Sequence, residues 1–408
     1  MRKIIVVLIV VFIPLTLLPC TTAIVSGDAT VDGRPLLWKH RDTGYFQNKI
    51  MYFEDGKYPY IGLVNSVDIE GEEIWAGVNS AGFAIMNSAS SNLKPGDDTT
   101  TIQDREGIIM KLALQQCATL EDFEKLLHEL PKPLGVETNF GVIDARGGAA
   151  YYETNNFTFR KFDVNDPGIA PDGYLIRSNF SYSGEPDEGH GYIRYDMATE
   201  LFEQQSDVEK FSAEFILTRA TRSLKHSRTG VDLRDIELKP AGTTQFHFFR
   251  DFIPRFTSTS SIVVRGVLPD ESPDYTTMFT ILGFPLASVT VPLRVAGGNE
   301  FPAFLNANES DVAPLSDASL TLKSHCFPVM KGSGRDYIDV NVLLNREETG
   351  LLQLIPEIER EIFSLEEEYF HTVLREGIDH VKVVEFYEGI EEIVEEFYEY
   401  TIGVSLLK

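Results

Sequence analysis

Leu17-Leu18-Pro19-Cys20-Thr21-Thr22-Ala23 is the stretch from which the organisation of the chain can be inferred. Before it, a basic start at residues 2–3 is followed by a nearly unbroken apolar run over residues 4–18, too short to span a bilayer comfortably. This pattern is typical of a secretory signal peptide, and removal of residues 1–19 would leave Cys20 as the first residue. Its α-amine, titrating near pH ~7.7–8, could then serve as a base for the thiol.

Three other interpretations of this leader stay open. Signal peptidase could cut after Ala23 instead, because Thr21-Thr22-Ala23 offers small residues and Pro19 is unfavourable just before a cut. In that case Cys20 is discarded. Cys20 could also be the acylated residue of a bacterial lipoprotein, which Leu17 favours and Pro19 disfavours. The third alternative is an anchor that is not cleaved.

Composition narrows the class of protein. The chain has 408 residues and a formal net charge of −26, which argues against nucleic acid or anionic lipid as a partner. It has three cysteines, Cys20, Cys117 and Cys326, so an exported protein would keep at least one unpaired thiol. A Cys117–Cys326 disulfide remains possible. Because no zinc-type spacing of cysteine and histidine occurs, we expect no metal. Acyl transfer through a cysteine needs no cofactor, and we expect none.

The residues after the leader predict a hairpin. Thr21–Val25 and Pro35–Trp38 have strand patterns, and residues 28–34 supply turn chemistry between them. The second strand continues into Lys39-His40-Arg41-Asp42. A nucleophile at the head of one strand and the Asp42 carboxylate at the tail of its neighbour would lie close together. The alternative is that these charges are simply a solvated strand end.

A second polar residue falls inside an apolar strand. The turn Asn79-Ser80-Ala81-Gly82 is followed by a strand pattern over residues 83–90, which contains Asn87. A buried amide is costly without a hydrogen-bond partner. Asn87 therefore either holds a neighbouring loop or binds an oxyanion.

The order of elements predicts an α+β fold. Helix patterns begin at Asp104 and Thr119, each a candidate N-cap, and strand patterns follow over residues 138–144 and 149–154. Strands, a helical pair and strands again favour helices layered on sheets rather than βαβ repeats. Residues 193–224 have a helical pattern. Further amphipathic helices are predicted to begin at Pro356 and after Gly377, so we expect a main domain over 20–350 and a helical C-terminal extension over 351–408.

Four segments in this order resemble one group of enzymes. They are Cys20-Thr21-Thr22, Lys39-His40-Arg41-Asp42, Asn79-Ser80-Ala81-Gly82-Phe83 leading to Asn87, and Arg177-Ser178-Asn179-Phe180. The set is similar to the N-terminal-nucleophile hydrolases of the choloylglycine hydrolase, penicillin acylase and isopenicillin N acyltransferase-like kind. The resemblance implies a four-layer αββα sandwich with two antiparallel sheets between helices. It also implies cleavage or transfer of linear amide bonds through the first residue of the mature chain.

The resemblance assigns a role to each matching position. Cys20 would be the nucleophile, and Asp42 would orient its amine and thiol. Lys39 stands where relatives carry Arg or Lys. Asn87 and Asn179 fall where relatives hold the tetrahedral oxyanion.

Two departures from the pattern bear on the substrate. His40 and Arg41 replace an Asn followed by an apolar or aromatic residue. Bile-salt hydrolases carry another catalytic Arg in a Ser-Arg-Phe segment, whereas here Ile262 stands at the equivalent place and Arg265 follows three positions later. These departures weaken bile salts as the substrate and favour the broader acyltransferase-like branch.

The sequence thus predicts a secreted or periplasmic amidase or acyltransferase that works through a Cys20 thioester. Its partner would be a small-molecule amide substrate, with no stable membrane span after processing and with a homo-oligomer possible. The alternative is a secreted or lipid-anchored binding protein that keeps the fold without catalysis.

Overall fold

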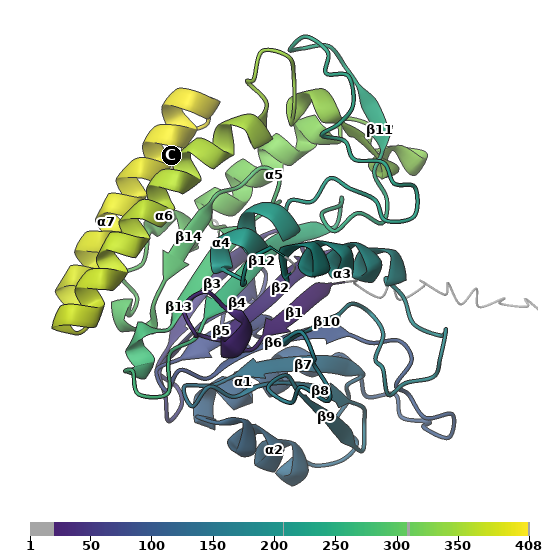
Figure 1. Ribbon diagram of the computed structural model, residues 1–408, viewed down its shortest axis with the longest axis vertical. Helices are drawn as coiled ribbons and strands as arrows, with labels where there is room; N and C mark the ends of the chain where they lie inside the picture. Colours follow the sequence, from purple (N-terminus) through teal and green to yellow (C-terminus); the bar gives the residue numbers. More distant parts are fainter. Residues whose placement is uncertain (1–19, 207, 308–310, 407–408) are drawn as a thin grey trace, which may run out of the picture.

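The computed structural model describes residues 20–206, 208–307 and 311–406. The leader expected over residues 1–19 lies outside them. Within the described residues, the strands form two large antiparallel sheets, one six-stranded and one seven-stranded, together with a separate strand pair. Figure 1 shows the two sheets between helices.

The six-stranded sheet is assembled from distant parts of the chain. Its strands, in spatial order, are β10 (Tyr174–Arg177), β1 (Thr21–Val25), β2 (Leu36–Asp42), β12 (Ser258–Arg265), β13 (Thr277–Leu282) and β14 (Thr290–Leu293). The predicted hairpin is confirmed, because β1 pairs with β2 from Thr21 opposite His40 to Val25 opposite Leu36. The first strand was expected over Thr21–Val25, the same residues as β1. The second was expected over Pro35–Trp38, whereas β2 runs from Leu36 to Asp42.

The seven-stranded sheet follows the order of the chain. Its strands are β3 (Asn48–Phe53), β4 (Tyr60–Asn65), β5 (Ala76–Asn79), β6 (Ala84–Ala89), β7 (Thr138–Ile143), β8 (Ala149–Thr154) and β9 (Phe159–Asp163). The separate pair is β11 (Phe246–Phe248) with β15 (Tyr337–Asp339).

One apolar core lies between the two sheets. Ile24 and Leu37 of the six-stranded sheet belong to the same buried cluster as Ile61 and Met86 of the seven-stranded sheet. Because side chains alternate along a strand, the neighbours of Ile24 and Leu37 face outward. Each sheet therefore needs a second layer on its outer face.

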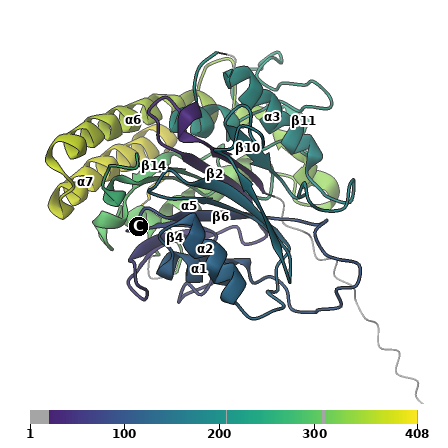
Figure 2. The same ribbon diagram turned by 60° about the horizontal axis from the view of Figure 1, so that its bottom comes forward.

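Helices supply these outer layers. Helices α1 (Glu106–Gln116) and α2 (Leu120–Glu129) pack on the seven-stranded sheet, and α3 (Tyr192–Ser206) and α4 (Ala213–Phe215) pack on the six-stranded sheet. Figure 2 shows α1 and α2 beneath β4 and β6, on the side away from α3. The expected four-layer αββα arrangement is thereby confirmed.

The remaining helices follow β14 in the chain. They are α5 (Pro314–Cys326), α6 (Leu351–Glu376) and α7 (His380–Glu396). Helices α6 and α7 lie side by side along one flank (Figure 1), and α6 contacts β14. No helix of the described residues is both long and apolar enough to cross a membrane.

The predicted start of α6 at Pro356 was wrong. The helix begins at Leu351, after Gly350, and Pro356 lies inside it. The Gln353 side chain accepts a hydrogen bond from the Gly350 backbone (3.0 Å), which satisfies an N–H at the helix start. Leu351 and Leu352 are buried, so apolar contacts begin the helix before the proline.

Three further helix predictions differ in outcome. Thr119 caps α2 through a capping box with Asp122, as predicted. Asp104 does not cap α1, because it has a positive φ of 61° and the N-cap position falls on Arg105. The long helix expected over residues 193–224 is interrupted after Ser206 and resumes as α4 and the π-helical turn η2 (Ile216–Ala220).

All three cysteines lie in the described residues, where they are free and buried. Cys117 belongs to the core beneath α1 and α2, whereas Cys326 belongs to the core between the sheets. The Cys117–Cys326 disulfide that the sequence left open is therefore not formed. Burial raises the pKa of the Cys117 thiol to about 12 and also raises that of Cys326.

Candidate active site

Cys20 immediately precedes β1 and is buried. Alternation along the strand places it on the face of Thr22, whose hydroxyl accepts a hydrogen bond (2.9 Å) from Tyr151 of the seven-stranded sheet. This face lies between the two sheets. Thr21 points to the opposite face, where its hydroxyl accepts a hydrogen bond (2.7 Å) from Arg194 of α3.

Lys39 of β2 lies on the inter-sheet face with Cys20. Its ammonium donates hydrogen bonds to Asn87 Oδ1 (2.6 Å) and to the Trp75 carbonyl (2.5 Å). Burial lowers the pKa of Lys39 to about 7; a negative charge on Cys20 opposes this shift and the charge of Arg41 adds to it. The structure therefore brings Lys39 and Asn87, two predicted site residues, into direct contact.

Arg41 is a second buried cation between the sheets. Its guanidinium donates to the side-chain oxygens of Asn48 and Asn65 (2.8 Å for Asn65) and lies over the Trp75 ring, 4.9 Å from its centroid. Burial lowers its pKa to about 10, opposed first by a negative charge on Cys20. A residue noted in the sequence as a departure thus becomes part of the surroundings of Cys20.

Arg194 connects Cys20 to Asn179. The guanidinium donates to the Cys20 carbonyl (2.6 Å) and to Asn179 Oδ1 (2.6 Å). The Asn179 side-chain nitrogen in turn donates to the carbonyl of Ala89 (2.9 Å), two residues after Asn87 on β6. The two predicted oxyanion residues therefore lie near the same end of β6. Asn87 belongs to this strand, and Asn179, which follows β10 of the other sheet, bonds to its last residue.

Sequence reasoning missed Arg194. The available signal was its position on the apolar face of a predicted helix, three, four and eight residues before Met197, Ala198 and Phe202, which are all buried. A cation on such a face requires buried hydrogen-bond acceptors. Burial lowers the pKa of Arg194 to about 9.

Asp42 lies on the opposite face of β2 from Lys39. Its carboxylate accepts hydrogen bonds from Arg255 Nη2 (2.9 Å) and Nε (3.1 Å) and from Ser258 Oγ (2.6 Å). In the part of the chain that the structure describes, no hydrogen bond joins Asp42 to Cys20. The orienting role expected for Asp42 stays a prediction, and Arg255 and Ser258 are partners that the sequence did not indicate.

His40 is the histidine nearest to these groups in the sequence. It pairs with Thr21 on the face away from the thiol, and its Nε2 lies 3.0 Å from Ser258 Oγ. Burial lowers the pKa of His40 to about 4, although the charge of Asp42 opposes this. His40 is therefore neutral at physiological pH and faces away from Cys20.

Arg265 lies far from this group. Its guanidinium donates to Glu366 of α6 (2.9 Å) and to Thr277 (3.1 Å). On β12, Ser258 pairs with Asp42 and Arg265 pairs with Leu36, so the two ends are separated by roughly 23 Å of extended strand. Arg265 is not part of the candidate site.

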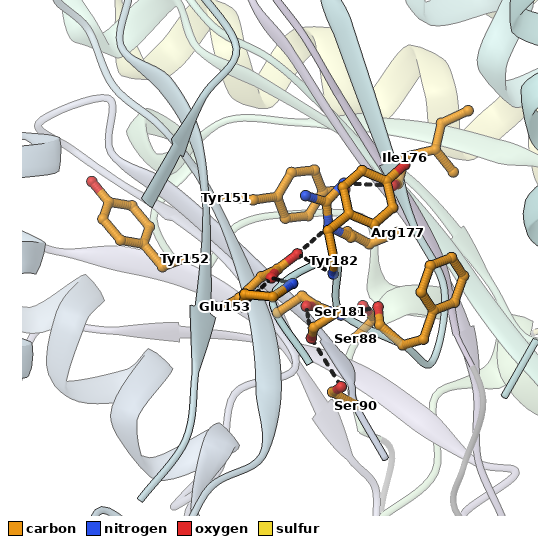
Figure 3. Close-up of polar contacts among 12 residues, drawn as sticks. Ser88, Ser90, Tyr151, Tyr152, Glu153, Ile176, Arg177, Ser181 and Tyr182 are labelled. Atoms are coloured by element: carbon orange, nitrogen blue, oxygen red, sulfur yellow. Dashed lines mark hydrogen bonds and ion pairs between the residues drawn. The ribbon is translucent and has the colours of Figure 1, made fainter. Parts of the chain in front are cut away.

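A buried polar network fixes the segment that follows Asn179 (Figure 3). Arg177 forms a salt bridge with Glu153 (2.8 Å), and its guanidinium stacks on the Tyr182 ring at 3.8 Å. The Glu153 carboxylate also accepts hydrogen bonds from the backbone N–H groups of Tyr182 (2.9 Å) and Ser183 (2.7 Å). The loop is thus tied to β8 of the other sheet, which fixes the Asn179 position.

These contacts define a buried thiol among cations. Lys39, Arg41 and Arg194 each bind at least one Asn side-chain oxygen, and within the described residues none of them forms a salt bridge. Their positive charge is therefore left for a thiolate or an oxyanion.

Comparisons with known proteins give no match in sequence. No protein-family model matches the chain, and no curated protein matches it.

Solved structures do show similarities. The Caenorhabditis elegans ortholog of N-acylethanolamine-hydrolyzing acid amidase is 14% identical, with 63% of this chain and 96% of that chain covered and a TM-score of 0.42. A variant of the conjugated bile acid hydrolase from Clostridium perfringens is 11% identical. The match covers 69% of this chain and 94% of that chain, with a TM-score of 0.40. Penicillin V acylase from Agrobacterium tumefaciens is 12% identical. The match covers 67% of this chain and 86% of that chain, with a TM-score of 0.35.

These structures are of the kinds that the sequence resembles, an amidase, a bile acid hydrolase and a penicillin acylase. At such TM-scores the likeness carries no conclusion about the activity or the substrate of this chain.

Proposed function

We propose that the protein is an exported amidase or acyltransferase that acts on linear amide bonds, in non-peptide or small peptide substrates, through Cys20. In this proposal residues 1–19 are removed and Cys20 becomes the first residue. The observation that carries it is the set of buried cations around Cys20 whose partners are neutral amides and carbonyls rather than carboxylates.

Such a set provides positive charge in the surroundings of Cys20. A buried cation that already has a carboxylate partner contributes little further attraction, whereas a protonated one bound to neutral oxygens can still attract an anion. Lys39, Arg41 and Arg194 all respond electrostatically to a charge on Cys20. The arrangement suits a thiolate nucleophile better than a structural cysteine such as Cys117, which lies in an apolar core.

The proposed reaction begins with a proton transfer within the first residue. The free α-amine of Cys20 accepts the thiol proton, directly or through one water molecule, and the thiolate attacks the amide carbonyl carbon. The carbonyl π electrons move to oxygen and give a tetrahedral oxyanion. The Asn87 and Asn179 side-chain amides donate hydrogen bonds to it, and one such donor is typically worth about 2.7–4 kcal/mol.

The intermediate then collapses to a thioester. The carbon–nitrogen bond breaks as the ammonium of Cys20 protonates the leaving nitrogen, which departs as an amine. Water or an acceptor amine attacks the thioester carbonyl, and Cys20 leaves as the thiol. Hydrolysis and acyl transfer share this acyl-enzyme and differ only in the second nucleophile.

The structure of β1 favours Cys20 over Ile24 as the first residue of the processed protein. Thr21, Thr22 and Ala23 are fully buried and pair with β2, and Thr22 and Ala23 also pair with β10. A cut after Ala23 would remove most of a central strand from the sheet. A cut before Cys20 leaves β1 whole.

Intact mass and N-terminal sequencing of the exported protein test the first part of the proposal. A chain that begins with an unmodified Cys20 supports it. Acylated Cys20 would instead support a lipid-anchored protein, and a chain that begins at Ile24 would exclude Cys20 from any role.

Replacement of the nucleophile tests the second part. In correctly processed protein, Cys20→Ser should lower amidase activity by orders of magnitude, because a terminal amine activates a hydroxyl far less readily than a thiol. Cys117→Ser is the matched control, since Cys117 is also buried and free. Undiminished turnover in processed Cys20→Ser would contradict the assignment of Cys20 as the nucleophile. The remaining explanations would be another nucleophile or the binding-protein alternative.

A further inference from the structure

A cavity of about 400 Å³ lies between the η2 turn and the first half of α6. It is on the outer side of the six-stranded sheet, since η2 and α4 belong to the helical layer there, whereas the Cys20 thiol faces the other sheet. Its volume falls within the range of small-molecule sites. The cavity is separate from the candidate active site, and its proposed role does not depend on the proposed reaction.

The floor of this cavity is a completed ion pair. Arg222 forms a bidentate salt bridge with Glu359 of α6 and donates to the carbonyls of Pro285 (2.9 Å) and Ser288 (2.9 Å). Glu359 also accepts a hydrogen bond from the Thr290 backbone (2.8 Å). Because these groups already have partners, they form a rigid base and are not the ligand-binding groups.

The walls carry cations without carboxylate partners. Arg219 of η2, Arg234 and Arg360 of α6 all line the cavity. Within the described residues none of the three forms a salt bridge, although the chain as a whole has a net charge of −26. Burial lowers the pKa of Arg234; the charge of Asp232 opposes this shift, and the charges of Arg219 and Arg222 add to it. An anion placed between these guanidinium groups would relieve their repulsion.

The rest of the lining limits the kind of anion. Leu352, Ile355 and Phe363 of α6 present apolar surface in the same cavity. A free inorganic ion would use the arginines alone and leave this surface in water. A molecule with an anionic head and an apolar chain matches both parts.

We propose that this cavity binds an amphipathic organic acid, with its carboxylate between Arg219 and Arg360 and its acyl chain against Leu352, Ile355 and Phe363. Arginine is suited to the head group, because its fork of N–H donors matches a carboxylate. Glu214 also lines the cavity, and its negative charge opposes the ligand.

Calorimetric titration of the intact protein with octanoate tests the proposal. We expect saturable binding that falls at least tenfold in Arg219→Gln/Arg360→Gln and rises in Glu214→Gln. Arg219 and Arg360 are exposed, so their replacement should leave the thermal unfolding midpoint unchanged. A double variant of Arg228 and Arg250 to Gln, each 64% exposed, is the matched control and should bind octanoate like the wild type.

Three probes decide between outcomes. Octanol should bind far more weakly than octanoate, and inorganic phosphate alone should not compete. Equal binding of octanol, equal loss in both double variants, or no saturable binding of octanoate would overturn the proposal. So would a change of oligomeric state on replacing Arg219 and Arg360, since the cavity would then be a contact between chains.

Discussion

Two groups of buried cations in the described residues differ in their partners. Near Cys20, Lys39, Arg41 and Arg194 bind Asn side chains and backbone carbonyls. Beneath α6, Arg265 and Arg294 share the Glu366 carboxylate. Both regions are inside the protein, yet only the second is neutralised by a carboxylate.

The difference separates a site from a scaffold. A salt bridge satisfies a buried guanidinium and fixes a helix in place, which is what Glu366 does for α6. A cation bound to neutral oxygens keeps a positive potential that another charge can use. We infer that the neutral partners of the cations beside Cys20, more than burial itself, distinguish the candidate site from the ion pairs beneath α6.

Replacing one arginine from each region tests this comparison most strongly. Arg294→Gln strands Glu366 with one partner fewer and should lower the free energy of unfolding by about 3–5 kcal/mol, with unchanged activity of the folded fraction. Arg194→Gln removes bonds to neutral acceptors only, so it should cost about 1–3 kcal/mol but abolish most activity. Denaturant unfolding and turnover measure the two effects. If both variants lose stability and activity in the same proportion, the distinction fails.

The two Asn residues near Cys20 give the next largest expected effect. Asn87→Ala or Asn179→Ala should lower kcat by roughly 100- to 1000-fold, the usual cost of removing an oxyanion donor. Asn345→Ala is the matched control, because the Asn345 side-chain amide is also buried but bonds to the backbones of Thr349 and Asn341. It should lower stability and leave kcat unchanged. Equal kcat in all three variants would make Asn87 and Asn179 scaffold residues.

Asp42 has a smaller expected effect. Asp42→Asn keeps the size and acceptor capacity of the side chain but removes its charge. If the Asp42 carboxylate orients the Cys20 amine, the rate should fall about a hundredfold. Asp339→Asn is the control, because Asp339 is another buried carboxylate and accepts from the Gln245 and Asn341 backbones. A rate within about threefold of wild type would fall far short of general-base contributions. Together with unchanged thiol labelling of Cys20, it would show that Asp42 has a structural role only.

Measured per pH unit, the smallest expected effect is a pH dependence of stability. Lys39 has a pKa of about 7 in the folded protein and an ordinary value of 10.5 when unfolded, so between these values the unfolded chain binds the extra proton. Stability should therefore rise with pH across this window, by at most about 1.4 kcal/mol per pH unit.

A matched pair of variants isolates this effect. Lys39→Met should reduce the slope by up to one proton. Lys323→Met should do the same, because Lys323 is buried over the rings of Phe46 (4.3 Å) and Phe256 (4.8 Å) and its pKa is also lowered to about 7. The two should differ in activity, which only Lys39→Met lowers. An unchanged slope in Lys39→Met would show that Lys39 keeps its proton throughout.

Strands and helix ends that depend on neighbouring residues could be predicted from the sequence. Thr21–Val25 alternates between the two faces of a sheet, and Thr119 with Asp122 forms a capping box, so both were found from neighbouring residues. The start of α6 was misplaced because buried Leu351 and Leu352 outweigh the preference of Pro356 for a first turn.

The site was predictable only in part, for a related reason. Cys20, Lys39 and Asn87 stand in recognisable positions of strands. Arg194 and Arg255, by contrast, reach the site from segments more than 170 residues along the chain from their partners, as the Arg194–Cys20 separation of 174 and the Arg255–Asp42 separation of 213 show. No local pattern specifies such contacts.

The unequal connectivity of the two sheets has a consequence for the order of folding. The seven-stranded sheet joins neighbours in the chain, from β3 to β9, so it can grow by successive local pairing. The sheet that carries Cys20 must close much longer loops, such as those given by the sequence separations of 155 between Thr22 and Arg177 and of 223 between Trp38 and Ser261. We expect the local sheet to form first and to serve as the surface on which β1 and β2 are later completed. A nascent chain that ends before Arg255 thus contains Cys20 but lacks Arg255 and Ser258, the partners of Asp42, so the candidate site is assembled only when synthesis has passed them.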